Sequence, residues 1–540
     1  MSTEQTAASP RKLSPPAAIV ATAVLVFIGF SALWLLDDHR LPGGGDPARH
    51  LATTLEYADL IGDGDIGTLL EIRADGDSFF YPPLVRLVGA IPAAFGLAVE
   101  DWGTLMLNLV FVPLLAAACF LIGRLVYGPR AGVLAAIFAL GTPIVLSLFH
   151  VFLLDAPLAA CVGITLWALL ASQRFARRRE SVLAGVLLGV ALLVKTVAPI
   201  FLIGPIAVML IGGGWRQWRN IALFGVIALA IAAPYYVIHL DHLFDISNQA
   251  TTTGLQQGAG TIYGGYERFS VSNLTWYGWA ALNIQYFLPL LALFAIGLVA
   301  SLREVRRRTH LLELLVGLAT GYLLVTFALS IRDPRYTVPL VVFVAVIATG
   351  WITTTKLRWA RIAGTAVLAV AVLANLAVAA TDGLPTLRIN ENTDQFSDVV
   401  ERGALTVLDD RGYVVGPPRS DPFWERLLET AEREGLETAK INVHEAPTWG
   451  TDVLGFDLTA KQHGIDGESY VDGTLERADL VINTWFSADG YWVDDQGYPP
   501  PCARVNEGTN APVGSEAVAL AVSVSRLGPD GYERWCDFLE

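Results

Sequence analysis

The chain has 540 residues, of which 53% are hydrophobic and 16% are charged, and its mean hydropathy is +0.49. A soluble core of this length does not need so many apolar residues, and average soluble proteins are about one-quarter charged. The composition therefore excludes an ordinary soluble protein and indicates an integral membrane protein. The net charge of −14 also argues against a nucleic-acid partner.

Apolar runs follow one another through the first two-thirds of the chain, each close to the ~20 residues that a helix needs to cross about 30 Å of hydrocarbon. We predict about eleven spans. They fall near residues 17–36, 103–126, 131–149, 152–172, 181–194, 197–213, 219–238, 279–301, 311–330, 338–353 and 362–381. The fifth and sixth are short and can instead form one re-entrant pair. The first run is long and no small-residue cleavage site follows it, so we predict a retained helix rather than a signal peptide.

The basic residues fall on alternate loops between these runs. Placing the N-terminus in the cytoplasm puts every basic loop on that side, as the positive-inside rule requires. These residues are Arg11, Lys12, Arg124, Arg130, Arg174, Arg177, Arg178, Arg179, Arg216, Arg219, Arg303, Arg306, Arg307, Arg308, Lys356, Arg358 and Arg361. We predict a multi-pass protein of the cell (plasma) membrane, with a cytoplasmic tail at residues 1–16 and, because the number of spans is odd, an extracytoplasmic C-terminus.

Residues 382–540 are predicted to form a separate extracytoplasmic soluble domain. From Asp382 onward the sequence has 30 Asp and Glu against 12 Arg and Lys, a net of −18, so the acidity of the chain belongs to this tail. Apolar runs at 405–408, 440–443, 479–482 and 517–524 predict strands, and residues 421–434 predict a helix. We expect a small α/β domain.

The four cysteines divide between the two parts of the chain. Cys119 and Cys161 lie in predicted spans and are interpreted as packing residues. Cys502 and Cys536 lie in the outer domain, where oxidation is available, so a disulfide and two free thiols are both open. A zinc site is disfavoured because neither outer cysteine has a CxxC partner.

A few ionisable residues lie on the predicted outer side, away from the basic loops. The first outer loop, residues 37–102, contains Asp37 and Asp38, then a glycine run before Asp46, and then His50. A stretch of helical period follows, suited to lying on the membrane surface. A carboxylate ahead of such a helix is placed to act as a general base on a substrate that arrives from lipid. The alternative is that these acids only cap helices and mark the outer boundary.

Two Asp-Gly-Asp strings, residues 63–65 and 75–77, lie in the same loop. Asp-x-Asp holds a divalent metal and a nucleotide sugar in many soluble glycosyltransferases. Nucleotide sugars are not normally supplied on the outer face, so we interpret both strings as turns.

Asp155 and Lys195 lie near the outer ends of the fourth and fifth predicted spans. An ionised group at depth costs on the order of 3 kcal/mol, so each is expected to face a partner or a polar cavity. Either the two form a purely structural pair, or they belong to a polar site in which Lys195 faces a phosphate.

The short outer loop after the ninth predicted span holds Arg332, Asp333, Arg335 and Tyr336. Guanidinium groups bind phosphate oxygens in a bidentate manner, which makes both arginines candidates for a phosphate site. Interfacial lipid anchoring is the alternative. Asp333 is expected to be a local partner of its neighbouring arginines.

Five segments resemble, in chain order, the landmarks of GT-C glycosyltransferases. They are residues 46–50, 81–84, 154–158, 192–196 and 332–336. The chain is most similar to the branch named after protein O-mannosyltransferases and the aminoarabinose transferases of lipid A, family 39. The resemblance covers roughly residues 17–345, and it implies an α-helical polytopic fold of GT-C type with a catalytic membrane domain at 17–381.

The resemblance also implies an activity and a set of site residues. It implies transfer of a sugar from a polyprenyl-phosphate donor in the bilayer to a protein, lipid or envelope-glycan acceptor on the outer face, with inversion. Asp46 matches the catalytic base, although Pro47 stands where the family usually has Glu, which leaves Asp37 or Asp38 as alternatives. The remaining implied residues are Asp155 in the catalytic set, Arg332, Arg335 and Lys195 on the donor phosphate, and His50, Tyr81 and Tyr336 in the substrate pocket.

No nucleotide cofactor is expected, because the sequence has neither a P-loop string nor GxGxxG. The sequence assigns no metal ligands, and a requirement for a divalent metal stays open. A transporter or lipid flippase is the main rival, but such proteins commonly show two similar halves, and no internal repeat is visible here. An inactive homologue acting as an envelope scaffold is the second rival, because of Pro47.

Overall fold

The computed structural model describes residues 14–38, 46–65, 67–68, 81–96, 106–240, 268–329, 332–380, 387–389, 405–408, 438–443, 466–471, 480–487, 504–505 and 517–524. The chain divides into two compact units. One comprises residues 1–37 and 56–414, and the other comprises residues 38–55 and 415–540. Each unit is described by itself.

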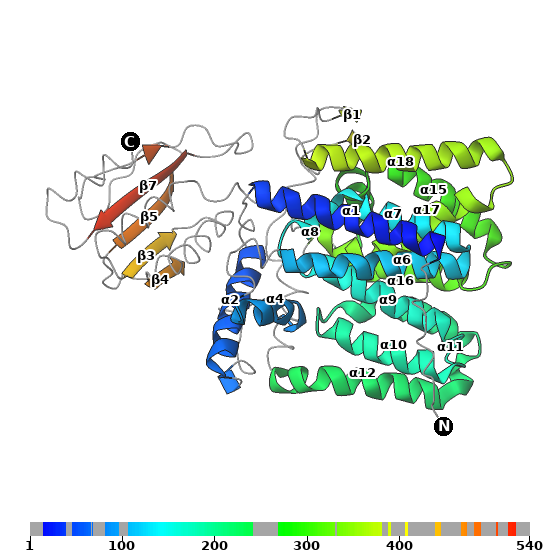
Figure 1. The fold of residues 1–540 in the computed structure, drawn as a ribbon, viewed down its shortest axis with the longest axis horizontal. Helices are drawn as coiled ribbons and strands as arrows, with labels where there is room; N and C mark the ends of the chain where they lie inside the picture. The colour runs from blue at the N-terminus through cyan, green and yellow to red at the C-terminus, as the bar shows by residue number, and fades with distance from the viewer. Residues whose placement is uncertain are drawn as a thin grey trace, which may run out of the picture. The chain divides into compact units, whose positions relative to one another are not determined.

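The first unit is helical (Figure 1). Its longer helices are α1 (Pro15–Asp38), α4 (Leu84–Ala94), α6 (Phe111–Val126), α7 (Pro129–Leu140), α8 (Pro143–Phe149), α9 (Asp155–Ala171), α10 (Arg178–Leu192), α11 (Ile203–Ile211), α12 (Trp218–Ile238), α14 (Val271–Ala280), α15 (Phe287–Glu304), α16 (Leu311–Ala328), α17 (Val341–Thr354) and α18 (Arg358–Ala380). Short helical turns are η1 (Asn108–Val110), η2 (Ala198–Phe201), η3 (Gly214–Gln217), η4 (Ala281–Gln285) and η5 (Pro334–Leu340). Helix α2 (Asp46–Asp63) has residues in both units.

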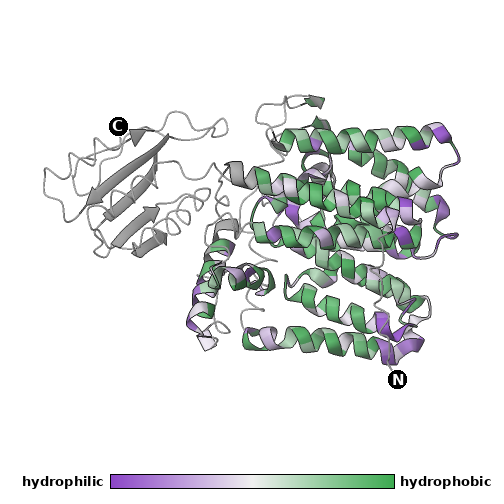
Figure 2. Ribbon diagram, in the orientation of Figure 1, coloured by the Kyte–Doolittle hydropathy of each residue, from purple (hydrophilic) through white to green (hydrophobic). Residues whose placement is uncertain are grey.

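Helix is present in each of the eleven ranges predicted to span a membrane, and Figure 2 shows apolar residues along the length of these helices. Among the described residues, 7 helical segments are long and apolar enough to cross a bilayer, and the pair α7–α8, bent by 62°, would make an eighth. Helices α9, α10 and α11 have only 17, 15 and 9 residues. The chain is therefore a multi-pass membrane protein, whereas the number eleven stays a prediction.

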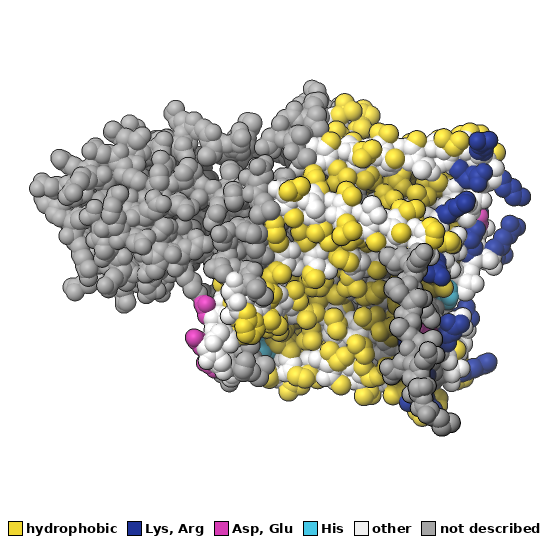
Figure 3. All heavy atoms as spheres, viewed as in Figure 1, with side chains coloured by type: hydrophobic (Ala, Val, Ile, Leu, Met, Phe, Trp, Pro, Cys, Tyr) yellow, Lys and Arg dark blue, Asp and Glu magenta, His cyan; other side chains and the backbone are white. Residues whose placement is uncertain are grey.

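The helical unit has one basic end. Figure 3 shows its Lys and Arg side chains gathered there. Arg124 lies in the last turn of α6 and Arg303 in the last turn of α15, whereas Arg178 and Arg358 begin α10 and α18. Because α9 runs toward this basic end while α10 and α16 run away from it, the start of α9 and the ends of α10 and α16 lie at the opposite end of the unit. The candidate residues that follow or begin these helices share that end, and its assignment to the outer face stays a prediction.

Several helices approach so closely that their backbones touch. A Cβ on Gly297 of α15 would lie 2.1 Å from the carbonyl oxygen of Ile347 on α17, and a Cβ on Gly132 of α7 would lie 2.3 Å from the carbonyl oxygen of Phe120 on α6. Small residues at such crossings provide the close packing on which helix association in a bilayer depends. Helix α17, which continues from η5, is almost wholly buried by this packing.

The second unit contains a mixed sheet of β3 (Thr438–Val443), β4 (Asp466–Val471), β5 (Leu480–Ser487), β6 (Arg504–Val505) and β7 (Ala517–Val524) in the order β4-β3-β5-β7-β6. Strands β4, β3 and β5 are parallel, and β7 is antiparallel to β5 and β6. The hairpin β1 (Leu387–Ile389) and β2 (Leu405–Leu408) belongs to the helical unit. Strands occur at all four predicted ranges, whereas the predicted helix at 421–434, Cys502 and Cys536 lie outside the described residues.

Replacing Gly297 by Ala is expected to lower the thermal unfolding temperature of the detergent-solubilised protein by several degrees, because the new methyl group collides with the backbone of α17. Gly225→Ala on α12 is the matched control, since a Cβ there meets nothing within 4 Å. That control is expected to be neutral or slightly stabilising, because Ala favours helix over Gly by roughly 1 kcal/mol. Equal unfolding temperatures for the two variants would contradict the close crossing of α15 and α17.

Candidate functional site

Asp155 and Lys195 form a buried ion pair between the start of α9 and the residues that follow α10. The Nζ atom of Lys195 donates a hydrogen bond to Oδ1 of Asp155 at 2.8 Å, and the two side chains are 11% and 3% exposed. Asp155 is the first residue of α9, so its carboxylate also lies at the positive end of that helix dipole. The partner that the sequence predicted for each charge is therefore present.

Two tyrosine rings flank the ammonium of Lys195. Its Nζ atom lies 5.6 Å from the ring centroid of Tyr81 and 5.4 Å from that of Tyr336. Both distances are within the ~6 Å over which the face of an aromatic ring attracts a cation, an effect worth roughly 0.5–2 kcal/mol. Residues predicted in distant segments of the chain thus converge on Lys195.

Arg335 lies beside the second of these rings, with Cζ 5.8 Å from the ring centroid of Tyr336. Its Nε atom donates to Oδ2 of Asp333 at 2.6 Å, and its backbone N–H donates to Oδ1 at 2.9 Å. Asp333 therefore caps η5 and fixes the direction of the Arg335 side chain, which confirms its predicted part as a local partner of arginine. The Arg335 side chain is 20% exposed.

Arg332 is placed differently from Arg335. It is 2% exposed, and its Nε atom donates to Oδ1 of Asn273 on α14. Asn273 in turn donates to the carbonyl of Thr326 on α16 at 3.2 Å. Of the two arginines predicted to bind phosphate, Arg335 is the more accessible, and Arg332 joins the end of α16 to the start of α14.

Tyr81 is held by hydrogen bonds to its carbonyl oxygen. The hydroxyl of Tyr235 on α12 donates to it at 2.8 Å, and Nη1 of Arg86 on α4 donates to it at 3.5 Å. The N–H of Leu84 donates to the carbonyl of Leu193 at 3.0 Å, which ties the start of α4 to the end of α10. Arg86 is 1% exposed, and its Cζ lies 5.9 Å from the ring centroid of Tyr81, so a second cation lies near that ring.

The residues predicted to supply the base lie at the ends of the first two helices. Asp37 and Asp38 end α1, and Asp46 begins α2. Their side chains lie outside the described residues, so the roles assigned to them stay predictions. His50, predicted for the substrate pocket, is a buried residue of α2 in the second unit.

The first Asp-Gly-Asp string forms a turn, as predicted. Helix α2 ends at Asp63, and Gly64 adopts a left-handed φ of 75° that favours glycine. The carboxylate of Asp65 accepts hydrogen bonds from the N–H and the hydroxyl of Thr68 at 3.0 and 2.7 Å, which hold the pKa of that carboxyl below its usual range. The second string, residues 75–77, lies outside the described residues.

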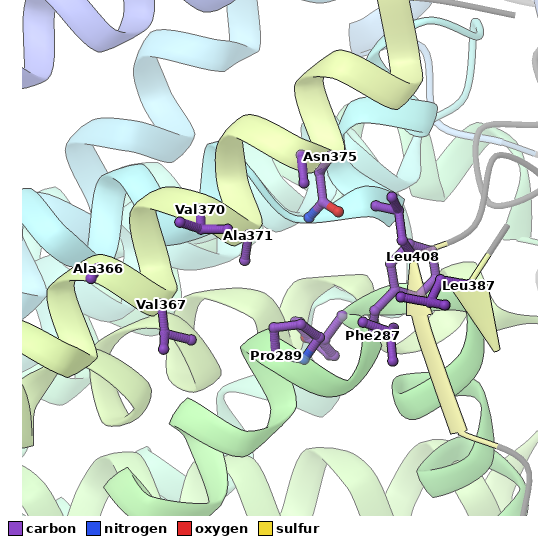
Figure 4. A pocket seen from close by; sticks show the side chains of 12 residues that line it. Phe287, Pro289, Ala366, Val367, Val370, Ala371, Asn375, Leu387 and Leu408 are labelled. Carbon is purple, nitrogen blue, oxygen red and sulfur yellow. The ribbon is translucent and has the colours of Figure 1, made fainter. Parts of the chain in front are cut away.

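An apolar groove of about 370 Å³ lies between α15, α18 and the hairpin β1–β2 (Figure 4). Its lining includes Phe287, Val367, Val370 and Leu408, and no lining residue is charged. The groove therefore suits hydrocarbon rather than a phosphate, and it is distinct from the residues around Lys195.

The described residues around Lys195 include neither a metal-binding group nor a thiol. Across the described residues, no group of three or more His, Cys, Asp or Glu side chains is arranged to hold a metal ion. Cys119 and Cys161 are buried free thiols, in keeping with their predicted packing role.

Sequence analysis missed several polar residues that support the site. Arg86 carried a signal, since it lies outside the basic loops like Arg332 and Arg335. Tyr235, Asn273 and Gln285 carried none. An amide or a phenol in an apolar stretch is unremarkable until the packing of α12 and α14 gives it a partner.

Residues 81–238 match the family model described as dolichyl-phosphate-mannose-protein mannosyltransferase. The structure of ArnT from Cupriavidus metallidurans bound to undecaprenyl phosphate is similar, with a TM-score of 0.60 and 17% identity over 95% of this chain and 99% of that chain. The same protein in the apo state gives a TM-score of 0.59 and 17% identity over 96% and 100%. No curated protein sequence matches this chain.

The two comparisons cover different parts of this chain. The family match includes Tyr81, Asp155 and Lys195 but ends before the turn that carries Arg335 and Tyr336. At 17% identity the likeness to ArnT shows that the two proteins share a fold over nearly the whole chain. The role of each site residue therefore depends on the geometry around Lys195.

Lys195→Met is expected to destabilise the protein by about 3–5 kcal/mol, because it leaves the Asp155 carboxylate buried without its cation. Adding Asp155→Asn is expected to recover most of that loss. The measurement is the free energy of unfolding in mixed detergent micelles across the double-mutant cycle.

Arg308→Met is the matched control for removing a cation from an ion pair. Arg308 pairs with Glu304, and these side chains are 27% and 33% exposed. A loss of no more than about 1 kcal/mol is expected from breaking this partly exposed pair, as for pairs near the surface. A Lys195 variant as mild as this control, or additive effects in the cycle, would contradict a coupled buried pair.

Proposed function

We propose that the protein is a membrane glycosyltransferase that moves a sugar from a polyprenyl-phosphate donor to an acceptor on the outer face of the membrane. The observation that carries the proposal is the Lys195 ammonium, held by Asp155 between the rings of Tyr81 and Tyr336. Arg335 adds a guanidinium beside the second ring. A sugar phosphate needs cations for its phosphate and shaped, rigid walls for its sugar, and this cluster offers both.

The proposed reaction is a single displacement. The Asp46 carboxylate takes the proton of the acceptor hydroxyl while that oxygen forms a bond to the anomeric carbon. The bond from this carbon to the carrier phosphate oxygen breaks on the opposite face, which inverts the configuration. The electron pair leaves with the polyprenyl phosphate, which gains one negative charge. Lys195 and Arg335 stabilise that charge, an effect that is strongest where water is excluded.

Asp155 takes part in this scheme by holding Lys195. Its hydrogen bond at 2.8 Å keeps the ammonium between the two rings. Asp37 or Asp38 is the alternative base if Asp46 does not serve. Tyr81 and Tyr336 shape the sugar pocket, with His50 as a further candidate for it.

The position of the cluster supports an outer active site. Its residues lie at the end of the helical unit opposite the Arg and Lys side chains of Figure 3, and the positive-inside rule assigns the basic end to the cytoplasm. A protein of the same fold, ArnT from Cupriavidus metallidurans, has been solved with undecaprenyl phosphate bound, which supports a polyprenyl-phosphate donor. Proteins, lipids and envelope glycans all offer hydroxyl acceptors.

A transporter or lipid flippase explains the cluster less well. Transporter sites lie near the bilayer midplane, at the interface of two repeats. Here the charges lie at helix ends, where α9 begins and α16 has ended. An inactive homologue is favoured only by Pro47, and an assay decides between these alternatives.

Asp46→Asn is expected to lower sugar transfer by roughly 10²–10⁴-fold, the contribution typical of a general base. The measurement is the consumption of polyprenyl-phosphate sugars by the purified protein, followed by mass spectrometry. The double variant Asp37→Asn, Asp38→Asn is the matched control and is expected to retain most of the activity.

Three other outcomes of this assay are informative. Full activity of Asp46→Asn would refute the base assignment, and loss of activity in the double variant alone would move the role to Asp37 or Asp38. A wild-type protein that consumes no donor would favour the transporter or the scaffold. The same assay with and without EDTA decides whether a divalent metal is required.

Arg335→Gln is expected to weaken binding of undecaprenyl phosphate about tenfold, because a charge-assisted hydrogen bond to phosphate contributes roughly 1.5–3 kcal/mol. The measurement is the dissociation constant of the detergent-solubilised protein. Arg303→Gln, at the basic end of α15, removes the same charge far from the cluster and is the control. Equal dissociation constants for these two variants would exclude Arg335 from the phosphate site.

A further inference from the structure

One helical segment contacts both ends of the turn that carries Arg335 and Tyr336. Helix α14 continues directly into η4, a π-helical turn that ends at Gln285. Asn273 lies near the start of this segment and Gln285 at its end. Each is a buried amide, and each reaches residues 332–337, which we call the phosphate turn.

The first contact fixes the beginning of the phosphate turn. The side chain of Asn273 is fully buried, and its Oδ1 atom accepts a hydrogen bond from Nε of Arg332. Its Nδ2 atom donates to the carbonyls of Arg268 at 2.6 Å and Thr326 at 3.2 Å. Because the oxygen and the nitrogen of this amide are both engaged, its orientation is determined, and the Arg332 side chain is directed by it.

The second contact fixes the residues on either side of Arg335 and Tyr336. The Nε2 atom of Gln285, a residue only 2% exposed, donates to the carbonyl of Pro334 and, at 2.7 Å, to the hydroxyl of Thr337. These two acceptors bracket the pair in sequence. π-Helical turns are rare and frequently occur at functional sites, and this one ends with the amide that reaches the phosphate turn.

We propose that Asn273 and Gln285 are positioning residues for the donor phosphate, which they serve by holding the phosphate turn against Lys195. The proposal rests on the function proposed above. The distance from Lys195 to the Tyr336 ring is 5.4 Å, close to the limit of about 6 Å at which a cation and a ring attract each other. A displacement of roughly 1 Å in a positioning element is enough to reduce catalysis about 10²-fold.

The decisive variant is Gln285→Leu, which replaces the amide by an apolar side chain and removes both donated hydrogen bonds. Asn375→Leu is its matched control. Asn375 on α18 is also a buried amide, and its Nδ2 atom donates to the carbonyl of Gly141 at 2.9 Å, a contact outside the phosphate turn. Both variants lose a buried amide, so a general loss of stability affects them alike.

Two readouts separate positioning from stability. Hydrogen–deuterium exchange of a peptide covering residues 332–337 is expected to rise about tenfold in Gln285→Leu and to stay unchanged in Asn375→Leu, since roughly 1.4 kcal/mol of lost local stability corresponds to tenfold. The dissociation constant for undecaprenyl phosphate is expected to rise about tenfold in Gln285→Leu. Its control is Arg303→Gln at the basic end of α15, because Asn375 lines the apolar groove that suits hydrocarbon. Asn273→Asp, which keeps the acceptor for Arg332 but loses both donors, is expected to raise exchange at the same peptide.

The outcomes distinguish this proposal from the function on which it rests. Unchanged exchange at residues 332–337 in Gln285→Leu would overturn the holding role. Raised exchange with an unchanged dissociation constant would overturn the positioning of the phosphate. If the wild-type protein binds no undecaprenyl phosphate, the proposed function fails together with the phosphate role, while the exchange data still decide whether Gln285 holds the turn.

Discussion

An ammonium among apolar helix ends is stable only where an anion and polarisable groups surround it. Lys195 has Asp155 at 2.8 Å and two tyrosine rings within 5.6 Å. The anion comes from α9, and the rings come from the segments before α4 and after α16. The need to stabilise this ammonium therefore brings together segments that are far apart in the sequence. The geometry of the site follows from that need.

The helical frame gives that cluster its rigidity. Tyr336 lies in η5, which continues into α17, a helix largely enclosed by its neighbours. Helix α17 in turn touches the backbone of α15 at Gly297. The turn that presents Tyr336 is thus fixed on one side by a packed helix and on the other by the amides of α14 and η4. The close backbone contact at Gly297 therefore helps to hold the site rigid, although it is not part of the site.

The sequence predicted the helices well, because a membrane-spanning helix can be recognised from the length of its apolar run alone. It predicted less well where a helix breaks or begins inside an apolar run. Residues 131–149 read as one span, but the helix breaks at Gly141, where a Cβ would lie 2.3 Å from a methyl group of Val372 on α18. Residues 152–172 read as another, but that helix begins only at Asp155. Local signals accompany both boundaries, with Gly141 and Pro143 at the first and Asp155 and Pro157 at the second, but apolar length alone does not reveal them.

The candidate site was predictable in its charges and unpredictable in its supports. Asp155, Lys195 and Arg335 stand out because ionisable residues are costly at membrane depth and rare on the outer side. Asn273 and Gln285 do not stand out, since neutral amides are tolerated in many helices. Only the crossing of α14 and η4 with the phosphate turn gives them partners, and a crossing is a property of the fold.

Two cations of the cluster are paired with acids before any donor binds. Lys195 is paired with Asp155 and Arg335 with Asp333, so these two ion pairs carry no net charge. Pairing weakens the pull of each cation on a phosphate, but it lets both cations remain fixed in an apolar setting, where an unpaired one would be far more costly. Fixed charges need no reorganisation when the leaving phosphate gains its charge, and this is the condition under which electrostatic stabilisation of a transition state is largest. Asp155 and Asp333 therefore allow Lys195 and Arg335 to be fixed in position before the donor binds.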